Sequence, residues 1–348
     1  MDAHGIPSAG DFAVVRHSGA VFLEGTERVT IQNCNLTRLD GNGIVVSGWN
    51  RDVNISRNSI SWIGDNGIVV WGYTNETAVN PLEGFDGTDG NHPVRTRVEG
   101  NVIREIGIYT KQTSWIFQAK AALTEITGNV LLNAPRNGLT FNDAFAGGDI
   151  TARNLMLSAL RESSDGGVWN SWNRQPFLTV YKDGTPSQYP TWRTVSYNFV
   201  INNYHGLVPI DADDGTAWVR MDHNFVAGGA WGFKNFFGHD KVFHDNINVF
   251  PWNNVVDPST PYLAGHVDQY FNNTVFIRDT NLTAMSGSMF GHGCSGTGIR
   301  QITVTGTTIY TGTGTVKWGC ESNDGKGNTV AKLPAEADMI AMGRLLLW

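Results

Sequence analysis

One short pattern recurs along the chain and constrains its fold more than any other feature. Each copy has an apolar residue, two or three polar residues, an asparagine and a second apolar segment, as in EITGNVLL (125–132) and RMDHNFVA (220–227). The repeated asparagines are Asn35, Asn58, Asn101, Asn129, Asn154, Asn198, Asn224, Asn246 and Asn273. Six of the eight intervals between them span 22–28 residues, and the other two span 43 and 44. This period predicts stacked structural repeats, the long intervals carrying inserted loops or a degenerate repeat.

The composition favours strands and turns over helices. The chain has 41 glycines and many asparagines, and only 16% of its residues are charged; such a composition is typical of turns and strands. Several repeats continue into a second strand that begins at glycine, as in NGIVVSGW (42–49) and NGLTFND (137–143). Glycine suits the bend between two strands of one coil. We therefore predict an all-β solenoid in which stacked asparagines form hydrogen bonds from coil to coil.

Asparagine-laddered coils of this length resemble the right-handed parallel β-helix of the pectin-lyase-like superfamily, over about Val29 to Tyr310. The resemblance implies one solenoid of about ten coils at residues 1–330, with insertions near 72–95 and 171–193. The end of the chain, LPAEADMIAMGRLLLW, breaks the pattern and has apolar residues at roughly helical spacing. We expect residues 331–348 to form a short C-terminal helix that caps the last coil.

Charge and hydropathy exclude two classes of partner. The net charge is −7 without a basic block, which disfavours nucleic acid, and no apolar run reaches the roughly 18 residues of a membrane span. No signal peptide is visible at the start, but several glycosylation sequons favour an extracellular, secreted protein. The oligomeric state stays open. So does the state of the cysteines: Cys294 and Cys320 could form a disulfide or, like Cys34, be free thiols.

Residue types that act on sugars concentrate between Lys111 and Lys241, on repeats that would stack about 4.8 Å apart. The densest stretch is RESSDGGVWNSWNRQP (161–176), which we expect in a groove wall and not in the core, because its arginines and asparagines could not all find partners if buried. The candidate catalytic carboxyls are Asp143, Glu162, Asp165, Asp213 and Asp214, and Asp211 is a further candidate. The candidate substrate-binding residues are Lys111, Gln118, Lys120, Asn142, Arg161, Asn170, Trp172, Arg174, Lys234 and His239.

These segments are similar to those of a subgroup of β-helix proteins grouped with polysaccharide-acting enzymes. The similarity rests on KQTSWIFQAK (111–120), GLTFNDAFAGG (138–148), RESSDGGVWNSWNRQP, DADDGTAW (211–218) and GHDKVFHDN (238–246). It implies a carbohydrate-active protein whose partner is a polysaccharide or oligosaccharide. This chain has Gly166 and Asn173 where the subgroup has a histidine and an aspartate, which leaves open an altered or inactive site.

Three functions follow from these residues. The first is a glycoside hydrolase with paired carboxylates, Asp143 acting with Glu162 or Asp165 for retention, or with Asp213 for inversion. The second is a polysaccharide lyase or epimerase on uronic acids, with a lysine or arginine near the substrate carboxylate. The third is a non-catalytic glycan-binding or structural solenoid, in which Asp213–Gly215 is an ordinary turn. No cofactor is expected, although Asp86, Asp89 and Asn91 offer oxygens for Ca²⁺ in what is otherwise a plain acidic loop.

Overall fold

The computed structural model describes residues 19–73, 90–142, 146–172, 191–201, 206–213, 215–236, 238–251, 254–258, 264–277, 302–312 and 327–333. Within these ranges every regular element is a β-strand, and the strands form three parallel sheets that we name A, B and C. No helix long and apolar enough to cross a membrane occurs in the described part of the chain.

Each sheet gathers strands from successive coils. Sheet A contains β1 (Gly19–Glu27), β4 (Asn42–Arg51), β7 (Ile68–Trp71), β11 (Ile116–Ala119), β14 (Leu139–Phe141), β17 (Gly167–Ser171), β20 (Val208–Ala212), β23 (Trp231–Asn235) and β26 (Asn254–Pro258), with β8 (Pro93–Val94) beside β4. Sheet B contains β2 (Thr30–Gln32), β5 (Asn54–Ser56), β9 (Arg97–Glu99), β12 (Glu125–Thr127), β15 (Ile150–Ala152), β18 (Arg193–Ser196), β21 (Val219–Asp222), β24 (Lys241–His244), β27 (Asp268–Phe271) and β29 (Ile302–Thr305). Sheet C contains β3 (Asn35–Leu39), β6 (Ser59–Ile63), β10 (Val102–Arg104), β13 (Val130–Leu132), β16 (Leu155–Leu157), β19 (Phe199–Ile201), β22 (Phe225–Ala227), β25 (Ile247–Val249), β28 (Thr274–Phe276), β30 (Thr308–Thr311) and β31 (Thr329–Lys332).

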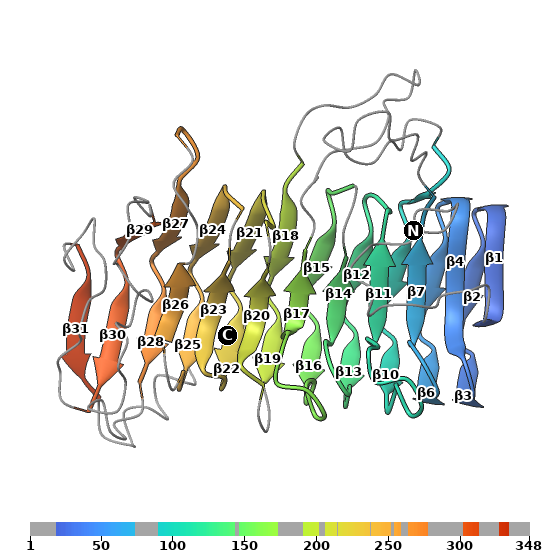
Figure 1. Cartoon of the computed structure of the whole chain (residues 1–348), viewed down its shortest axis with the longest axis horizontal. Helices are drawn as coiled ribbons and strands as arrows, with labels where there is room; N and C mark the ends of the chain where they lie inside the picture. Colours follow the sequence, from blue (N-terminus) through green and yellow to red (C-terminus); the bar gives the residue numbers. More distant parts are fainter. Residues whose placement is uncertain are drawn as a thin grey trace.

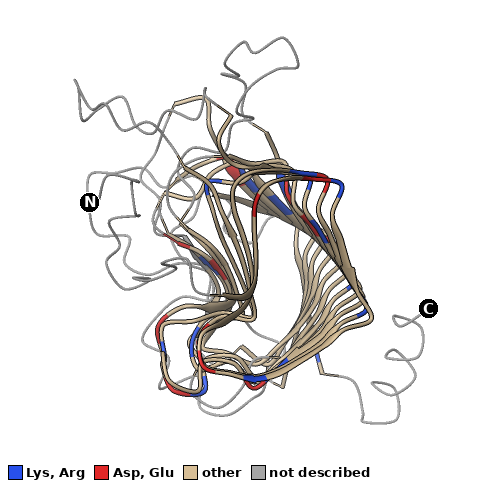
Figure 2. Cartoon of the chain, turned by 90° about the vertical axis from the view of Figure 1, so that its right-hand side faces the viewer, with Lys and Arg blue, Asp and Glu red and all other residues tan. Residues whose placement is uncertain are grey.

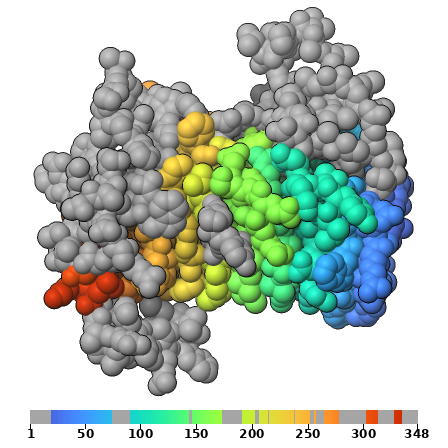
Figure 3. Space-filling model, turned by 60° about the horizontal axis from the view of Figure 1, so that its bottom comes forward, coloured from blue at the N-terminus to red at the C-terminus, as the bar shows by residue number. Residues whose placement is uncertain are grey.

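The chain passes from sheet A to B to C and then begins the next coil (Figure 1). Crossovers between parallel strands are almost always right-handed, and the fold is the predicted right-handed parallel β-helix. Viewed along its axis the coils superimpose, with charged residues mostly at the corners (Figure 2). From the side, sequence order follows the long axis in bands (Figure 3). Strand β31 reaches Lys332, so the solenoid extends two residues into the segment expected to be helical; the remaining cap, from 334, lies outside the described residues, and the number of coils stays a prediction.

The core fills the inside of the coil, with side chains from all three sheets. One coil illustrates the pattern: Ile44 of sheet A, Ile55 of sheet B and Ile60 of sheet C are all fully buried in the same cluster. Burial of this kind stabilises the fold by about 25 cal/mol per Å² of apolar surface. Because strand side chains alternate, the neighbours of these residues point outward and are available for other contacts.

The asparagine repeat forms a continuous ladder at the corner between sheets B and C. The Asn198 side chain shows the unit: its Oδ1 accepts hydrogen bonds from the backbone N and the Nδ2 of Asn154, both at 3.0 Å, and its Nδ2 donates to the Thr151 carbonyl at 2.9 Å. The same arrangement links the predicted asparagines from Asn58 to Asn273. The preceding residue has positive φ, as at Tyr197 (φ 56°), so each corner is a tight turn.

The prediction is wrong for one residue, Asn35, which does not belong to the ladder. Asn35 begins strand β3 and is exposed, and its Cα partner in the next coil is Ser59. The ladder position in this coil belongs to Cys34, whose backbone amide donates to Asn58 Oδ1 at 2.9 Å. The error arises because VTIQNCNL contains two asparagines and neither stands at the corner itself. Cys34 is an exposed free thiol, whereas Cys294 and Cys320 lie outside the described residues.

Glycines set the bend from sheet C into sheet A, as the sequence predicted. A Cβ at Gly43 would lie 2.5 Å from the Gly67 carbonyl oxygen, and a Cβ at Gly67 would lie 2.6 Å from the Trp115 carbonyl oxygen. Successive coils approach so closely here that no side chain fits.

Replacing Asn198 by alanine should lower the free energy of unfolding by about 3 kcal/mol. The change leaves the buried amide groups of Asn154 and the Thr151 carbonyl without partners, and each unsatisfied buried group costs about 1–3 kcal/mol. Thermal and urea denaturation followed by circular dichroism measure the loss. Asn35→Ala is the matched control and should change neither midpoint, since Asn35 is exposed. Equal effects of the two variants would contradict the structural role of the ladder.

Candidate active site

The outward face of sheet A changes character along the solenoid. On the N-terminal coils it is apolar: Val45, Val69, Phe117 and Ala119 cluster with Trp71, whose ring stacks on Phe117 at a centroid distance of 5.7 Å. Tyr73 and Trp172 pack against this cluster. On the coils of β14, β17, β20 and β23 the outward positions become polar. Aromatic rings next to a few acids and amides on one face are typical of a ligand-binding surface.

Three polar side chains are aligned across neighbouring coils of this face. Asn170 on β17, Asp211 on β20 and Lys234 on β23 are register partners in sheet A. Asn170 Nδ2 donates to Asp211 Oδ2 at 2.9 Å, and Lys234 Nζ lies 3.3 Å from Asp211 Oδ1. Their strand neighbours, Trp169, Ile210 and Phe233, point inward and belong to the core. The alternation of β-strand side chains therefore brings residues 41 and 23 positions apart into one row.

A second carboxylate shares the same lysine. Asp213 follows Asp211 by two residues, so both leave strand β20 on the same side. Lys234 Nζ donates to Asp213 Oδ1 at 2.7 Å, and the indole Nε1 of Trp172 donates to Asp213 Oδ2. Because both acids contact one ammonium group, their Oδ1 atoms are no farther apart than the sum of 3.3 and 2.7 Å.

The surroundings of Asp211 and Lys234 raise the pKa values of both groups. Burial, reinforced by the negative charge of Asp213, raises the pKa of Asp211 to about 7, although Lys234 and Asn170 oppose the rise. Burial also acts to lower the pKa of Lys234, but the two carboxylates outweigh it, and that pKa lies above its ordinary value. Near neutral pH the row thus holds a carboxyl that can donate a proton and a permanently charged ammonium group.

Two asparagines on this face have hydrogen-bonding capacity to spare. Asn142 and Asn170 are both buried. Neither side-chain polar atom of Asn142 has a hydrogen-bond partner in the described part of the structure, and the same holds for Asn170 Oδ1. Buried polar atoms are nearly always paired in native proteins, and leaving one unpaired costs free energy. Asn142 lies in the coil before Trp172, and Asn170 contacts Asp211, so these atoms border the acid pair.

A buried ion pair supports this face from inside the coil. Arg193 on β18 and Asp149 are 1% and 0% exposed, and Asp149 Oδ2 accepts from Arg193 Nη2 at 2.8 Å and from Nε at 3.0 Å. Arg193 also donates to Ser171 Oγ at 3.0 Å, and its guanidinium lies over the Phe141 ring at 4.5 Å. Ser171 and Phe141 are the inward neighbours of Asn170 and Asn142. The pair therefore ties the strands behind the site to sheet B.

A second buried cation lies at the same edge of sheet B. Lys241 begins β24, is fully buried, and its backbone amide donates to Asp268 Oδ1 at 2.8 Å. Burial lowers the pKa of Lys241 to about 8, against the opposing charges of Asp268, Asp213 and Asp211. The sequence placed Lys241 in the candidate stretch without a role, and Arg193 was not singled out, because the chemistry was expected on the groove face and in insertions. The signal was present in the sequence: Arg193 and Lys241 each begin a short strand and stand two positions before a core residue, Val195 and Phe243.

Several predicted residues lie at the opposite end of strand β17. Lys111 Nζ contacts Glu162 Oε1 at 3.0 Å with both side chains about half exposed, and Arg161 Nη1 lies 3.3 Å from Glu105. Asp165 accepts from the buried Arg136 at 3.1 Å. The five residues of β17 separate Glu162 and Asp165 from Trp172. The predicted residues therefore divide between two ends of sheet A.

The expectation that the whole 161–176 stretch lies outside the core is wrong for its centre. Residues Gly167–Ser171 form a completely buried strand, and Trp169 fills the coil interior beside Phe141, with ring centroids 5.5 Å apart. Arg161 and Glu162 remain exposed. Asn170 is buried without entering the core because the strand alternation turns it outward.

The other predicted residues are placed as follows. Gln118 lies on β11 and Lys120 directly follows it, and both are buried. The Gln118 side chain donates to the Ala121 carbonyl at 3.2 Å. His239 lies at the corner after β23. Asn91 Oδ1 accepts from the Trp49 amide at 2.9 Å. Asp143, Asp214, Arg174, Asp86 and Asp89 fall outside the described residues, as do most of both predicted insertions.

Comparison with known proteins adds a fold likeness. No family model matches the sequence, and no curated protein matches it. Among solved structures, a mutant tailspike protein of E. coli bacteriophage HK620 in complex with a pentasaccharide aligns with a TM-score of 0.49 and 13% identity, over 83% of this chain and 51% of the tailspike chain. A GH136 lacto-N-biosidase from Eubacterium ramulus aligns with a TM-score of 0.43 and 12% identity, over 84% and 51%. The chain spans about half the length of these proteins, and similarity at this level carries no information on substrate or reaction.

Proposed function

We propose that the protein is a glycoside hydrolase whose active site is the outward face of sheet A around β17, β20 and β23. The observation that carries the proposal is the pair Asp211 and Asp213 on one lysine, with the pKa of Asp211 raised to about 7. Glycosidases need one carboxyl that is protonated and one that is ionised at the working pH. Asp211 is the proton donor to the leaving oxygen, and Asp213, held by Lys234 and Trp172, is the nucleophile.

The proposed pair differs from the one first expected. Glu162 and Asp165 lie at the other end of β17 and are engaged with Lys111 and Arg136. Retaining enzymes hold their carboxyls about 5–5.5 Å apart, and inverting enzymes about 6.5–9.5 Å apart. Because Lys234 contacts the Oδ1 atoms of both Asp211 and Asp213, these two atoms lie closer together than the inverting separation, and we propose retention of configuration.

The charge of the site favours hydrolysis over a lyase reaction. A lyase acting on uronic acids needs a base and a positive environment for the substrate carboxylate. Lys234 is held protonated by its two acids, so it cannot serve as a base near neutral pH. The carboxylate of Asp213 already balances the charge of Lys234, so no positive charge is left for the carboxylate of a uronate. Neutral sugars need no such charge. Their hydroxyls match the spare hydrogen-bonding atoms of Asn142 and Asn170, and the apolar cluster around Trp71 extends the surface along the solenoid.

A panel of polysaccharides tests the function directly. Arabinoxylan, mixed-linkage β-glucan, chitin, homogalacturonan, alginate and bacterial lipopolysaccharide are each incubated with the protein, and both reducing ends and ultraviolet absorbance of unsaturated uronides are recorded. We expect new reducing ends on a neutral glycan without unsaturated product, and NMR of the first-formed anomer should show retention. Unsaturated product would establish a lyase. Binding of a glycan without cleavage would leave a non-catalytic solenoid, and inversion would exclude Asp211 and Asp213 as the pair.

A further inference from the structure

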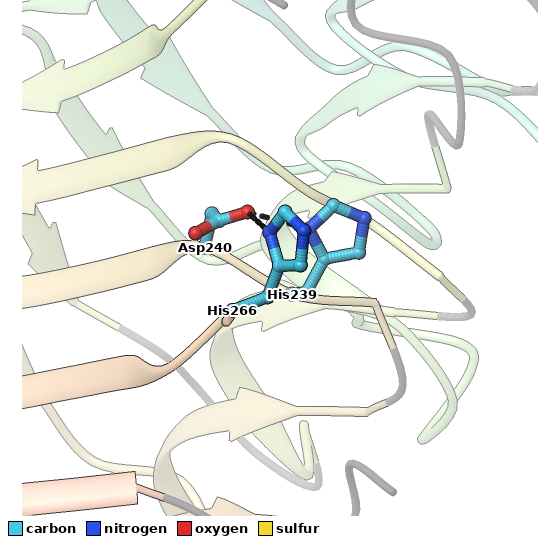
Figure 4. Close-up of side chains that lie close together, drawn as sticks. All are labelled: His239, Asp240 and His266. Carbon is cyan, nitrogen blue, oxygen red and sulfur yellow. Dashed lines mark hydrogen bonds and ion pairs between the residues drawn. The ribbon is translucent and has the colours of Figure 1, made fainter. Parts of the chain in front are cut away.

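A cluster of two histidines and one acid lies at the corner between sheets A and B. His239 Nδ1 lies 2.6 Å from Asp240 Oδ2, and His266 Nδ1 lies 2.5 Å from the same oxygen. The ligand atoms of the three residues all lie within 4.8 Å of one another. Figure 4 shows both imidazole rings turned toward the one carboxylate. One carboxylate oxygen thus contacts two ring nitrogens, whereas an ordinary histidine–aspartate pair has one such contact.

The solenoid fixes this arrangement from two successive coils. His239 and Asp240 form the turn before β24, and their carbonyls accept the backbone amides of Trp218 at 3.2 Å and Val219 at 3.3 Å. Asp240 has φ 53°, a left-handed conformation that directs its side chain from the tight corner. His266 comes from the next coil, just before β27. Trp218 packs edge-on against His239, with ring centroids 6.5 Å apart.

The cluster differs from the other histidine–acid contacts of the structure. His223 and His244 each contact one neighbouring carboxylate, Asp222 at 2.9 Å and Asp245 at 2.7 Å. Only His239, Asp240 and His266 bring three such groups together within the described residues. The side chains are 29%, 17% and 37% exposed, so an ion can reach them and the rings can adjust.

We propose that His239, Asp240 and His266 bind a zinc-class transition-metal ion. Two imidazole nitrogens and one carboxylate oxygen form the N₂O set found in zinc sites with three protein ligands, and water completes the tetrahedron. Imidazole selects Zn²⁺, Co²⁺, Ni²⁺ or Cu²⁺ over Mg²⁺ and Ca²⁺, which prefer oxygen ligands. Zinc bonds are about 2.0–2.2 Å long, so the ligand atoms must move apart slightly to surround the ion. The ion would link two coils at the corner that follows Lys234.

Metal titration of the tag-free protein tests the site. We expect one equivalent of Zn²⁺ to bind in isothermal titration calorimetry, and Co²⁺ to give visible absorption bands of a tetrahedral complex. Asp240→Asn is the informative variant, because asparagine tolerates the left-handed conformation of the turn while removing the charge. His266→Gln removes the ligand from the second coil. Each should weaken Zn²⁺ binding by about 100-fold or more, since even indirect partners of a metal contribute about 10–100-fold.

His244→Gln is the matched control, because it breaks a histidine–aspartate contact at another corner. We expect it to bind Zn²⁺ as the unaltered protein does. Circular dichroism establishes that all three variants are folded. The proposal is overturned if the unaltered protein binds no zinc-class ion, or if Asp240→Asn and His266→Gln bind it as tightly as His244→Gln. The first of these outcomes would leave a hydrogen-bonded cluster without a metal, and the second a metal bound elsewhere. The test does not depend on hydrolytic activity.

Discussion

Asp211→Asn should lower kcat on a cleaved glycan by about 10²–10⁴-fold, the usual contribution of a general acid. Asparagine preserves the shape of the side chain but has no proton to give to the leaving oxygen. In the unaltered protein the rate should also fall as pH rises through about 7, where Asp211 loses its proton. Initial rates measured from about pH 4 to about pH 9 test both effects, because the variant lacks this alkaline limb.

A substrate with a better leaving group distinguishes the role of Asp211 from that of Asp213. With an aryl glycoside of low leaving-group pKa, Asp211→Asn should recover the first step, measured as kcat/KM or as a burst of released aryl alcohol, although the second step still lacks its general base. Asp213→Asn should stay inactive, because the nucleophile is lost on every substrate. Asp222→Asn is the matched control: its carboxylate lies at the far end of sheet B strand β21 and contacts His223. Full activity of Asp211→Asn on the polysaccharide, or equal losses in Asp222→Asn, would remove Asp211 from the mechanism.

The fold could be predicted from the sequence because its main constraint is local and repeated. Each asparagine such as Asn198 lies at a corner where only its own side chain and the preceding turn residue determine the geometry. The stacking distance then makes every copy interact with the next one, so a period visible in the sequence becomes a ladder in space. The error in the ladder, Asn35 for Cys34, occurred where two asparagines flank the ladder position and the backbone amide alone makes the contact.

The site was only partly predictable, because it depends on which way each side chain faces. Trp169 and Trp172 are three residues apart in the same motif, yet Trp169 fills the core and Trp172 donates to Asp213 on the outside. The sequence identified Asp213, Lys234 and Asn170 as polar residues on neighbouring coils. It could not establish that Lys234 joins Asp211 to Asp213, since that requires the register of β20 against β23.

The length of the strands was the second reason why the site could not be fully predicted from the sequence. Glu162 and Trp172 belong to one dense stretch of sequence, but an extended strand moves forward about 3.3 Å per residue, so a few residues carry the chain across the whole sheet. Residues close in the chain therefore separate, and residues 41 positions apart, such as Asn170 and Asp211, come together.

Breaking the buried pair of Arg193 and Asp149 should cost about 3–5 kcal/mol of stability. Removing either partner leaves an uncompensated charge in an interior where both side chains are almost completely buried. Asp149→Asn is the mildest test, because asparagine can still accept the hydrogen bond that Thr124 gives to Asp149 Oδ1. Thermal and urea denaturation of Asp149→Asn and Arg193→Met measure the loss, and both should unfold at clearly lower temperature and urea concentration.

The double variant Asp149→Asn/Arg193→Met separates loss of charge balance from loss of packing. With no charge left to bury, it should be more stable than either single variant, because the desolvation penalty of the orphaned ion is gone. It should nevertheless lose activity, since Arg193 also holds Ser171 and covers Phe141, the inward neighbours of Asn170 and Asn142. A double variant that is stable and fully active would show that the ion pair serves the core alone. One that is stable and impaired would show that the solenoid positions its outer face from within.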